Sequence, residues 1–389
     1  MKGYNVAIVG CGSMGVEQLF ETTLPFTYSF AGAIFKNPQT RLAALVDTDQ
    51  KKLQELGSRL HSEGYGSGFG LYASLKEAVE GGKRTGLPID IVCCAAGPLI
   101  NAHVIRHAKS LGIRGVYCEK PLVLSLSEAD ELARVEAGTD VKIQVNYLRN
   151  YDTHHLAVVD FIRNGGIGEL LIVRALYKGG VIAVAPHAMA LLNRLFGKPL
   201  EVSACYSPIL NTRCLDDPNV DGTIRYRFDP QERDINVSIM ATGRGDFVND
   251  TYLFEFEFTG TKGRISILEN GWRTRYERME INRVFESLGE VMPYDTARIP
   301  LELKADAPRE FMIEGLGRLI DAIEHNTPTN CNVALARDAE EVAHALAIAA
   351  YKRETISLPL ADRTHVFANA KAGMKILKEE VGKTIPEKK

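Results

Sequence analysis

The sequence predicts an α/β protein: a doubly wound parallel sheet at the N-terminus, followed by an α+β region with a large, mainly antiparallel open sheet. Three observations carry this prediction. Short apolar runs alternate with helical patterns in the first third, a glycine-rich turn follows the first run, and apolar and charged residues alternate around residue 255. A chain of 389 residues is long enough for two domains. We place them at residues 1–123 and 124–389, with the last helices able to pack back on the first domain.

The apolar runs of the first third are the expected strands. They are rich in Val, Ile and Ala, as in strands buried on both faces of a parallel sheet, and span residues 6–9, 42–46, 89–96 and 115–118. Helical patterns lie between them at residues 50–60, 74–79 and 101–111. The second of these opens with Ser74 and has Glu77 three residues on, the pattern of a capping box. Repeated strand–helix–strand order implies right-handed crossovers and a doubly wound sheet.

The pattern changes after Pro121. A helix is expected at residues 127–135, a strand at 141–146 and a helix at 151–164, and the chain is then largely β from 170 to about 300. In residues 251–258 one set of alternate positions is aromatic and the other is mostly charged, which predicts an antiparallel sheet with one solvated face. Helices return at residues 309–326 and 334–352.

Composition narrows the classes of partner. A net charge of −3 leaves no surplus for binding nucleic acid or an anionic membrane surface. The seven cysteines are scattered without a C-x-x-C pair, so we expect reduced thiols and no metal site. No basic leader precedes the first apolar run, and no stretch approaches the ~18 apolar residues of a membrane helix. These features predict a cytoplasmic protein.

The glycine-rich turn is the first functional signal. Gly10, Gly12 and Gly15 follow the first strand directly and lead into a candidate helix, with Ser13 and Met14 between them. In that context the first glycine permits a tight turn, the second lets a pyrophosphate approach the backbone, and the third allows close packing of helix and strand. The alternative is an ordinary glycine-containing loop. We favour a dinucleotide-binding Rossmann domain.

The acidic residue expected at the end of the second strand is Asp47. Its carboxylate would accept hydrogen bonds from ribose hydroxyls and repel a 2′-phosphate, which favours NAD over NADP. Asp47 lies 32 positions after Gly15, although about 20 is usual, and residues 21–38 have the character of an insertion. A strand-end turn residue is the alternative for Asp47, and Lys51 and Lys52 leave NADP open.

At Cys118-Glu119-Lys120-Pro121 the chain resembles the glucose-fructose oxidoreductase / inositol dehydrogenase family, Gfo/Idh/MocA. The resemblance runs through the glycine turn, the strand and loop at residues 90–97, Gly168-Glu169, the turn at residues 260–263 and the final helices. It implies an NAD(P)-dependent oxidoreductase that transfers a hydride between nicotinamide and a secondary alcohol or ketone of a sugar, cyclitol or sugar derivative.

The same resemblance implies roles around Lys120. In that family the lysine of Glu-Lys-Pro reaches the substrate and the nicotinamide ribose, so Lys120 is the expected proton-transfer group and Glu119 a neighbour of the cofactor. A partly desolvated lysine suits this role because burial pulls its pKa toward the working pH. A surface salt bridge is the alternative for Lys120. The loop Ala95-Ala96-Gly97 is expected at the nicotinamide ribose, and Asn101 takes the place of a common histidine there.

The family's second catalytic element is an Asp four residues before a His, with another Asp three residues after it. His187 keeps the histidine, whereas the aspartate positions hold Ala183 and Ala190, so the usual proton relay is incomplete. His187 alone suits acid–base work because an imidazole titrates near neutrality. A buried, structural histidine is the alternative. The remaining substrate candidates, each of which could instead be a core residue or an ion-pair partner, are Tyr147, Arg149, Tyr177 and Lys178.

Three functions are therefore open. The first is a dehydrogenase or reductase, the second a redox-assisted lyase or glycosidase that regenerates NAD within one turnover. The third, motivated by Ala183 and Ala190, is a cofactor-binding regulatory protein that has lost catalysis. Relatives commonly pair their C-terminal sheets between subunits, which implies a homodimer or homotetramer with a small carbohydrate-like substrate as its ligand.

Overall fold

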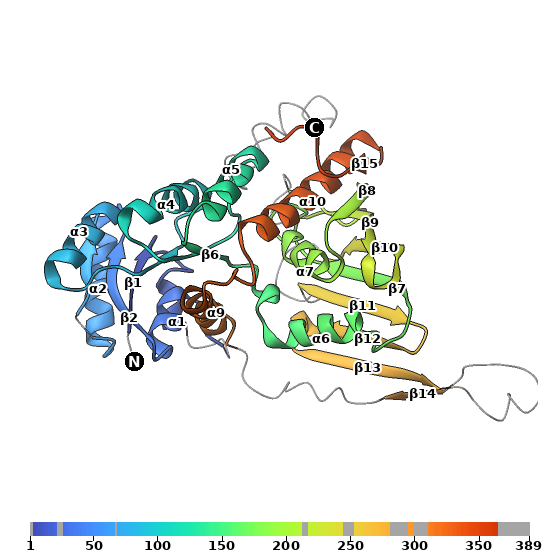
Figure 1. The fold of residues 1–389 in the computed structure, drawn as a ribbon, viewed down its shortest axis with the longest axis horizontal. Helices are drawn as coiled ribbons and strands as arrows, with labels where there is room; N and C mark the ends of the chain where they lie inside the picture. The colour runs from blue at the N-terminus through green and yellow to red at the C-terminus, as the bar shows by residue number, and fades with distance from the viewer. Residues whose placement is uncertain are drawn as a thin grey trace, which may run out of the picture. The chain divides into compact units, whose positions relative to one another are not determined.

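The computed structural model describes residues 3–21, 26–66, 68–211, 217–243, 253–280, 295–298 and 310–364. The chain divides into two compact units (Figure 1), Met1–Asp152 with Pro308–Arg337 and Thr153–Ala307 with Asp338–Lys389. The first unit therefore ends at residue 152 rather than at the expected 123. The reason is that the chain adds one more strand to the first sheet before leaving it, and later returns a helix to the same unit.

The first unit contains a six-stranded parallel sheet in the order β3-β2-β1-β4-β5-β6. This is the strand order of a Rossmann fold, so the predicted doubly wound sheet is confirmed. The strands are β1 (Tyr4–Val9), β2 (Thr40–Val46), β3 (Gly70–Tyr72), β4 (Ile91–Cys94), β5 (Gly115–Cys118) and β6 (Lys142–Val145). Every residue of β1, β4 and β5 is buried, as expected for central strands that are covered on both faces.

Within the described residues, six α-helices lie wholly in this unit. They are α1 (Phe30–Lys36), α2 (Gln50–Ser62), α3 (Leu75–Thr85), α4 (Pro98–Leu111), α5 (Leu126–Ala137) and the returning α9 (Phe311–His325). α1, α2 and α9 share one apolar core with β1, β2 and β4. The predicted serine cap is present, because the Ser74 hydroxyl accepts from the N–H of Glu77 at the start of α3. The Glu77 carboxylate accepts from the N–H of Ala73 and not from that of Ser74, so the capping box is formed only in part.

The second unit contains a nine-stranded sheet in the order β14-β13-β12-β11-β7-β10-β9-β8-β15. β7 and β10 pair in parallel and the other pairs are antiparallel, which confirms the predicted mainly antiparallel sheet. The strands are β7 (Leu170–Tyr177), β8 (Pro199–Tyr206), β9 (Val220–Phe228), β10 (Arg233–Ala241), β11 (Phe254–Gly260), β12 (Gly263–Leu268), β13 (Arg273–Glu280), β14 (Asp295–Arg298) and β15 (Ile356–Ser357).

One face of this second sheet is packed against helices. The buried side chains of β11 are Phe254, Phe256 and Phe258, as the alternating pattern predicted, while Tyr252 lies outside the described residues. Aromatic side chains of α6 (Thr153–Arg163) and α7 (Pro186–Phe196) contact aromatic side chains of the sheet. The last described helix of the chain is α10 (Val333–Lys352).

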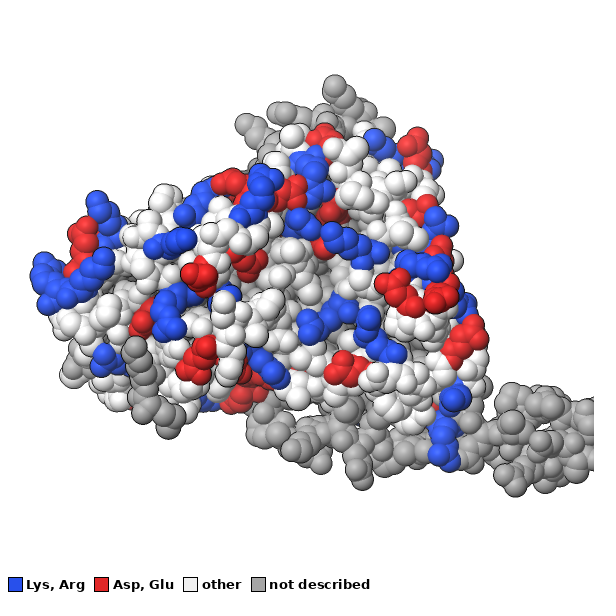
Figure 2. All heavy atoms as spheres, in the orientation of Figure 1, with Lys and Arg blue, Asp and Glu red and all other residues white. Residues whose placement is uncertain are grey.

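The opposite face of the second sheet carries a ladder of ion pairs across neighbouring strands. Arg174 of β7 lies 3.6 Å from Glu257 of β11, which also lies 3.7 Å from Arg264 of β12. These ion pairs identify the face that carries the ladder as the solvated side that the sequence pattern predicted. On the side of the molecule drawn in Figure 2, acidic and basic side chains are interspersed rather than separated by sign. Over the part of the chain that the structure describes, no helix combines the length and the apolar character that a membrane span requires.

Candidate functional site

A cleft of about 740 Å³ lies at the carboxyl ends of β1, β2 and β4. Ligands bind at this edge of open α/β sheets. Five of the residues predicted to bind the cofactor line it: Gly10, Gly12, Asp47, Ala95 and Ala96. The sequence interpretation did not single out several other lining residues, among them Thr48, Ser74, Lys76, Ile100, His103 and His107.

The three glycines of the turn are required for different reasons. Gly10 has φ +86° and a Cβ there would lie 2.7 Å from the backbone nitrogen of Ala96. A Cβ on Gly15 would lie 2.1 Å from the carbonyl oxygen of Gly10. A Cβ on Gly12, in contrast, would meet nothing but the Nζ of Lys52 at 3.6 Å. The fold itself therefore requires Gly10 and Gly15, whereas Gly12 keeps the cleft open for a ligand.

The turn has the features of an anion cradle. Within the described residues, the backbone N–H groups of residues 12–15 have no hydrogen-bond acceptor. The ammonium of Lys52 lies beside the turn and 3.2 Å from the Glu17 carboxylate, and the Lys52 side chain is 29% exposed. Free N–H groups and a nearby cation suit the two negative charges of a pyrophosphate. The residues present therefore fit a dinucleotide.

The helix expected directly after the turn is interrupted, and this part of the sequence prediction is wrong. After a 3₁₀ segment at Glu17–Phe20, α1 begins only at Phe30. The N–H of Phe30 donates to the carbonyl of Met14 and that of Ala31 to Gly15, both at 2.9 Å. Because a helical N–H donates to the carbonyl four residues earlier, Phe30 stands where Gln18 would stand in an uninterrupted helix. By sequence count, the 12 residues 18–29 thus stand between the two parts of one helix; we call them the excursion, and of them residues 22–25 lie outside the described residues.

The excursion accounts for the unusual position of Asp47. Without its 12 residues, Asp47 would follow Gly15 by 20 positions, which matches the usual spacing of about 20. One Asp47 oxygen accepts from the N–H of Cys11 at 2.9 Å and the other from the N–H of Asp49 at 3.1 Å. Each oxygen keeps a further lone pair. Asp47 thus stabilises the turn and still presents a carboxylate to the cleft.

Lys120 follows β5 in a turn that buried polar groups hold in place. Asn101 is fully buried, and its amide nitrogen donates to the carbonyls of Glu119 at 2.7 Å and Pro121 at 3.1 Å. The Glu119 carboxylate accepts from the amide of Asn146, and burial raises the pKa of Glu119. Asn101 was expected at the cofactor, but these contacts make it a support of the Lys120 turn. The turn is therefore fixed from both sides.

The four second-tier substrate candidates are buried in this structure. The hydroxyl of Tyr177 donates to the carbonyl of Val220 at 2.9 Å and accepts from its N–H at 2.8 Å, and the side chain is fully buried. Both hydrogen-bonding functions of the Tyr177 hydroxyl serve the sheet, and a contact between Tyr177 and substrate stays a prediction. Exposed fractions are 1% for Tyr147, 5% for Arg149 and 3% for Lys178.

The segment around His187 contains a carboxylate that the sequence interpretation missed. Asp217, which is 3% exposed, accepts from the N–H of Ile182 and from the N–H of Ala183, both at 2.8 Å. A Cβ on Gly180 would lie 2.0 Å from an Asp217 oxygen, so only glycine fits beneath this carboxylate. Asp217 lies 34 positions after Ala183. No local pattern links the two, so sequence spacing gave no signal for this contact.

His187 lies in the first turn of α7, after Pro186. Its half-buried ring packs beside Phe254, with ring centroids 5.8 Å apart. The two alanines at the family's aspartate positions differ in environment, because Ala183 is exposed and Ala190 is fully buried. An aspartate at position 190 would place a charge in the core, so alanine suits that position.

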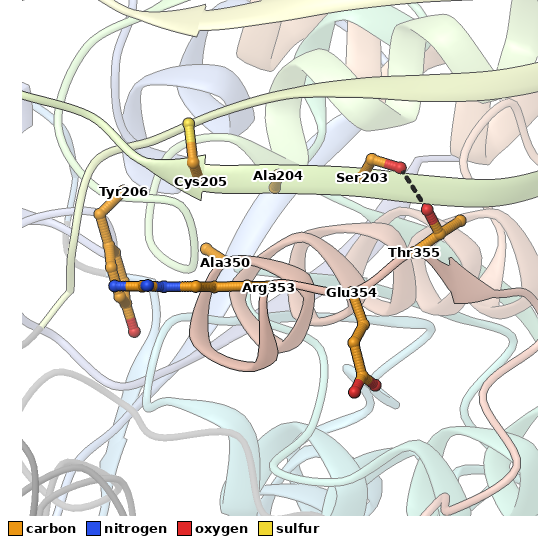
Figure 3. Close-up of a pocket in the computed structure, with 8 residues that line it drawn as sticks. All are labelled: Ser203, Ala204, Cys205, Tyr206, Ala350, Arg353, Glu354 and Thr355. Atoms are coloured by element: carbon orange, nitrogen blue, oxygen red, sulfur yellow. Dashed lines mark hydrogen bonds between the residues drawn. The ribbon is translucent and has the colours of Figure 1, made fainter.

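The second unit has a separate, open hollow of about 510 Å³ between the end of β8 and the end of α10 (Figure 3). Ser203 and Thr355 share a 2.8 Å hydrogen bond across one end, while Tyr206 and Arg353 extend toward the other end in this view. None of the predicted site residues lines this hollow. No group of three or more metal-ligating side chains occurs among the residues that the structure describes.

Comparisons with known proteins agree with this geometry. Residues 4–147 match the family model described as "Oxidoreductase family, NAD-binding Rossmann fold", GFO_IDH_MocA. An inositol 2-dehydrogenase from Rubrobacter xylanophilus is 28% identical over 182 residues, which are 46% of this chain and 44% of that protein. The match thus spans less than half the length of this curated relative.

Solved structures agree in fold over most of the chain. A putative myo-inositol dehydrogenase from Sinorhizobium meliloti 1021 is 18% identical with a TM-score of 0.63, covering 91% of this chain and 99% of that one. Levoglucosan dehydrogenase in complex with NADH and L-sorbose is 15% identical with a TM-score of 0.68, covering 92% of this chain and 100% of that one. These structures confirm the predicted fold over most of the chain, and the family resemblance inferred from the sequence is confirmed for residues 4–147.

Proposed function

We propose, on the premise that residues 4–147 belong to the NAD-binding Rossmann-fold oxidoreductase family Gfo/Idh/MocA, that the whole chain is an NAD-dependent dehydrogenase. Its substrate would be a sugar, cyclitol or sugar derivative, oxidised at a secondary alcohol or formed by reduction of the ketone. The names of the similar proteins, inositol 2-dehydrogenase and levoglucosan dehydrogenase, support this substrate class.

The observation that carries the proposal is the pairing of an anion cradle with a fixed lysine in one unit. The free N–H groups of residues 12–15 and the Asp47 carboxylate suit the pyrophosphate and a ribose of NAD. Lys120 follows β5, the strand beside β4, whose end borders the cleft. A positioned amine at this sheet edge is what alcohol oxidation needs.

Oxidation of a secondary alcohol removes a hydride from carbon and a proton from oxygen. Bound NAD supplies the hydride acceptor. The hydroxyl proton needs a base, and the neutral amine of Lys120 can take it and become an ammonium. Asn101 and Glu119 keep Lys120 in position by fixing the turn on which it lies. His187 stays the second proton-transfer candidate, as the family resemblance implies.

The alanines at the two positions where the resemblance implies aspartates leave two alternative functions open. The two alternatives that Ala183 and Ala190 motivate are a redox-assisted lyase and a catalytically inactive cofactor-binding protein. Asp217 favours an active enzyme, because a carboxylate held against the backbone of Ala183 keeps the loop before His187 ordered.

The test is incubation of the protein with NAD and a panel of inositols, aldoses and ketoses. The absorbance of reduced nicotinamide reports net oxidation, and chromatography reports substrate consumption. Net reduction of NAD supports the proposal. Consumption without net reduction indicates the lyase, and calorimetric binding of NAD with no consumption of any panel member indicates the inactive protein.

We also propose that two copies of the chain associate through the solvated face of the second sheet. Met240 of β10 pairs with Leu176 of β7, and Met240 and the nearby Ile172 are 40% and 46% exposed beside the ion-pair ladder. A second copy would cover these apolar side chains. Sedimentation should find a dimer or tetramer, and Ile172→Glu should shift it toward the monomer; a monomeric wild-type protein at micromolar concentration would contradict this. The cytoplasmic location stays a prediction.

A further inference from the structure

Two tyrosine hydroxyls lie together in the core of the first unit. Tyr117 of β5 and Tyr151, which follows the 3₁₀ segment at Leu148–Asn150, are both fully buried, and their hydroxyl oxygens are 2.8 Å apart. Burial raises the pKa of both phenols well above the ordinary value, so each hydroxyl keeps its proton and can donate it to a hydrogen bond. Two buried donors in an apolar core require a polar partner.

That partner is the side-chain amide of Asn146. The Tyr117 hydroxyl donates to the Asn146 oxygen at 3.1 Å, and the Tyr151 hydroxyl donates to the same oxygen. An amide oxygen has two lone pairs, so it can accept from both phenols. The Asn146 nitrogen donates to the Glu119 carboxylate and lies 3.4 Å from the sulfur of Met312 in α9. Both ends of the amide are therefore engaged.

The two phenols determine which way the Asn146 amide faces. An ionised carboxylate only accepts hydrogen bonds, so Glu119 requires the amide nitrogen, whereas the donating phenols require the amide oxygen. A rotation by 180° would set the amide oxygen against the carboxylate, with an acceptor on each side. The backbone N–H of Asn146 donates to the carbonyl of Cys118 at 2.9 Å, which fixes its main chain at the end of β5. The amide is thereby held in a single orientation.

The fold reserves space for the two hydroxyls. A Cβ on Gly315 of α9 would lie 2.3 Å from the Tyr117 hydroxyl oxygen and 3.1 Å from Cε2 of Tyr151. On α1, Phe30 packs its ring against Tyr117 with centroids 4.8 Å apart. Phenylalanines would fill the same core without polar atoms that need partners. The presence of both hydroxyls therefore points to a role beyond packing.

The hydrogen bonds of this cluster lead to Lys120. One Glu119 oxygen accepts from Asn146, and the other accepts from the backbone N–H of Lys120 at 3.3 Å. Burial raises the pKa of Glu119, whereas the hydrogen bond from Asn146 and the charge of Lys120 lower it. The Asn146 amide thus helps to keep a negative charge next to Lys120, in addition to fixing the turn.

We propose that Tyr117 and Tyr151 are positioning residues for Lys120. Their hydroxyls orient the Asn146 amide, and the oriented amide holds the Glu119 carboxylate next to Lys120. The role of Lys120 in catalysis rests on the proposed function, whereas the cluster rests on its contacts within the first unit. The phenols act only through Asn146 and Glu119, so their loss should affect proton transfer more than the binding of NAD or substrate.

The first test is Tyr151→Phe, which removes one hydroxyl and keeps the buried ring. We expect kcat for the best polyol of the panel to fall about 10-fold, with KM and the NAD dissociation constant within about 2-fold of wild type. The double variant Tyr117→Phe/Tyr151→Phe should lose more, because the Asn146 oxygen then has no phenol donor. Tyr226→Phe is the matched control, since Tyr226 is also fully buried and donates to the oxygen of Asn193 at 2.8 Å in the second unit. It should lower the melting temperature to a similar extent and leave kcat unchanged.

A second measurement needs no turnover and separates this inference from the proposed function. Labelling with trace acetic anhydride over a range of pH, followed by peptide mass spectrometry, gives the pH at which half of Lys120 reacts. Exposed Lys51 serves as the internal reference. In Tyr151→Phe the pH for Lys120 should fall by about 1, because a loosened amide leaves less negative charge on Glu119 to stabilise the ammonium. The pH for Lys51 should not move.

The titratable groups that interact electrostatically with Glu119 are Lys120, Tyr117, Tyr151, Cys94 of β4 and Tyr28 of the excursion. Burial raises the pKa of each phenol and of the thiol, so these groups are neutral near pH 7 and Lys120 is the charged member of the set.

The outcomes distinguish the two claims. If no panel member is turned over but the labelling of Lys120 shifts in Tyr151→Phe and not in Tyr226→Phe, the positioning role stands and the proposed function alone fails. A double variant with wild-type kcat, a loss of kcat shared equally by Tyr226→Phe, or labelling of Lys120 that Tyr151→Phe does not shift would overturn the positioning role.

Discussion

The glycine turn at residues 10–15 and the loop before His187 depart from their family pattern in opposite ways. The turn keeps every motif residue, although 12 residues interrupt the helix that follows. The segment around His187 has Ala183 before the histidine and Ala190 three residues after it, where the resemblance implies aspartates, and a distant carboxylate, Asp217, contacts the backbone of the loop before His187.

The difference depends on whether a site binds its ligand through backbone atoms or through side-chain atoms. The turn acts through backbone N–H groups, and these survive an insertion as long as the helix is completed by another segment, as Phe30 and Ala31 do here. The element that the resemblance implies around His187 would act through side chains, which a single substitution removes. An insertion can therefore leave a backbone site intact, whereas a side-chain site must be rebuilt from elsewhere in the fold.

The largest expected effect tests whether proton transfer depends on Lys120 in the first unit. Lys120→Ala should lower kcat by roughly 10²- to 10⁴-fold, the usual contribution of a proton-transfer group. NAD affinity should change only a few fold, because the N–H groups of residues 12–15 are untouched. Stopped-flow turnover and NAD titration measure the two quantities. Lys51→Ala, at an exposed lysine of α2, is the control, and a fully active Lys120→Ala protein would remove Lys120 from the mechanism.

Two glycine substitutions can separate the ligand's requirement from the fold's requirement. Gly12→Ala places a methyl group in open space beside Lys52, so the melting temperature should hold while NAD affinity falls by about 30-fold, or ~2 kcal/mol. Gly15→Ala drives a methyl group to 2.1 Å from the Gly10 carbonyl oxygen, so the melting temperature itself should fall. Calorimetry and thermal unfolding distinguish the two variants. Equal melting temperatures would contradict the division of roles among the glycines.

Substitution of Asp217 should destabilise the loop before His187. Asp217→Ala leaves the N–H groups of Ile182 and Ala183 without their acceptor, which should lower the free energy of unfolding of the second unit by roughly 2–3 kcal/mol. Asp217→Asn keeps one accepting oxygen and should lose about half as much. Denaturant unfolding measures both, and hydrogen exchange at residues 180–183 should show the loosening locally. Unchanged exchange there in Asp217→Ala would mean that the carboxylate does not hold the loop.

The same contrast explains how far the sequence could be interpreted. Local signals located the strands, Gly10 and Gly15, because spacing along the chain fixes backbone geometry within a few residues. Lys120 was assigned from the family resemblance, and its role stays a prediction. The excursion could be suspected from the spacing to Asp47, but its limits depend on hydrogen bonds between segments that are not contiguous. Asn101 and Tyr177 were of a plausible type and position, yet their side chains serve the turn and the sheet. The direction in which a side chain points depends on packing against residues that are distant in the sequence. The residues around it in the sequence therefore do not reveal that direction.

The smallest expected effect concerns the side chain that assists the backbone cradle. Lys52 lies beside the turn and is paired with Glu17 at 3.2 Å. Because the pair is partly exposed, Lys52→Ala should weaken NAD binding only about 3-fold, with a melting temperature close to wild type. Glu17→Gln should have the opposite sign, since it frees the ammonium for the pyrophosphate. Both effects should shrink as salt rises from low ionic strength to about 0.5 M, because exposed charges are screened. A salt-independent loss would place Lys52 in a buried contact instead, and no loss at all would leave the N–H groups of residues 12–15 as the whole of the cradle.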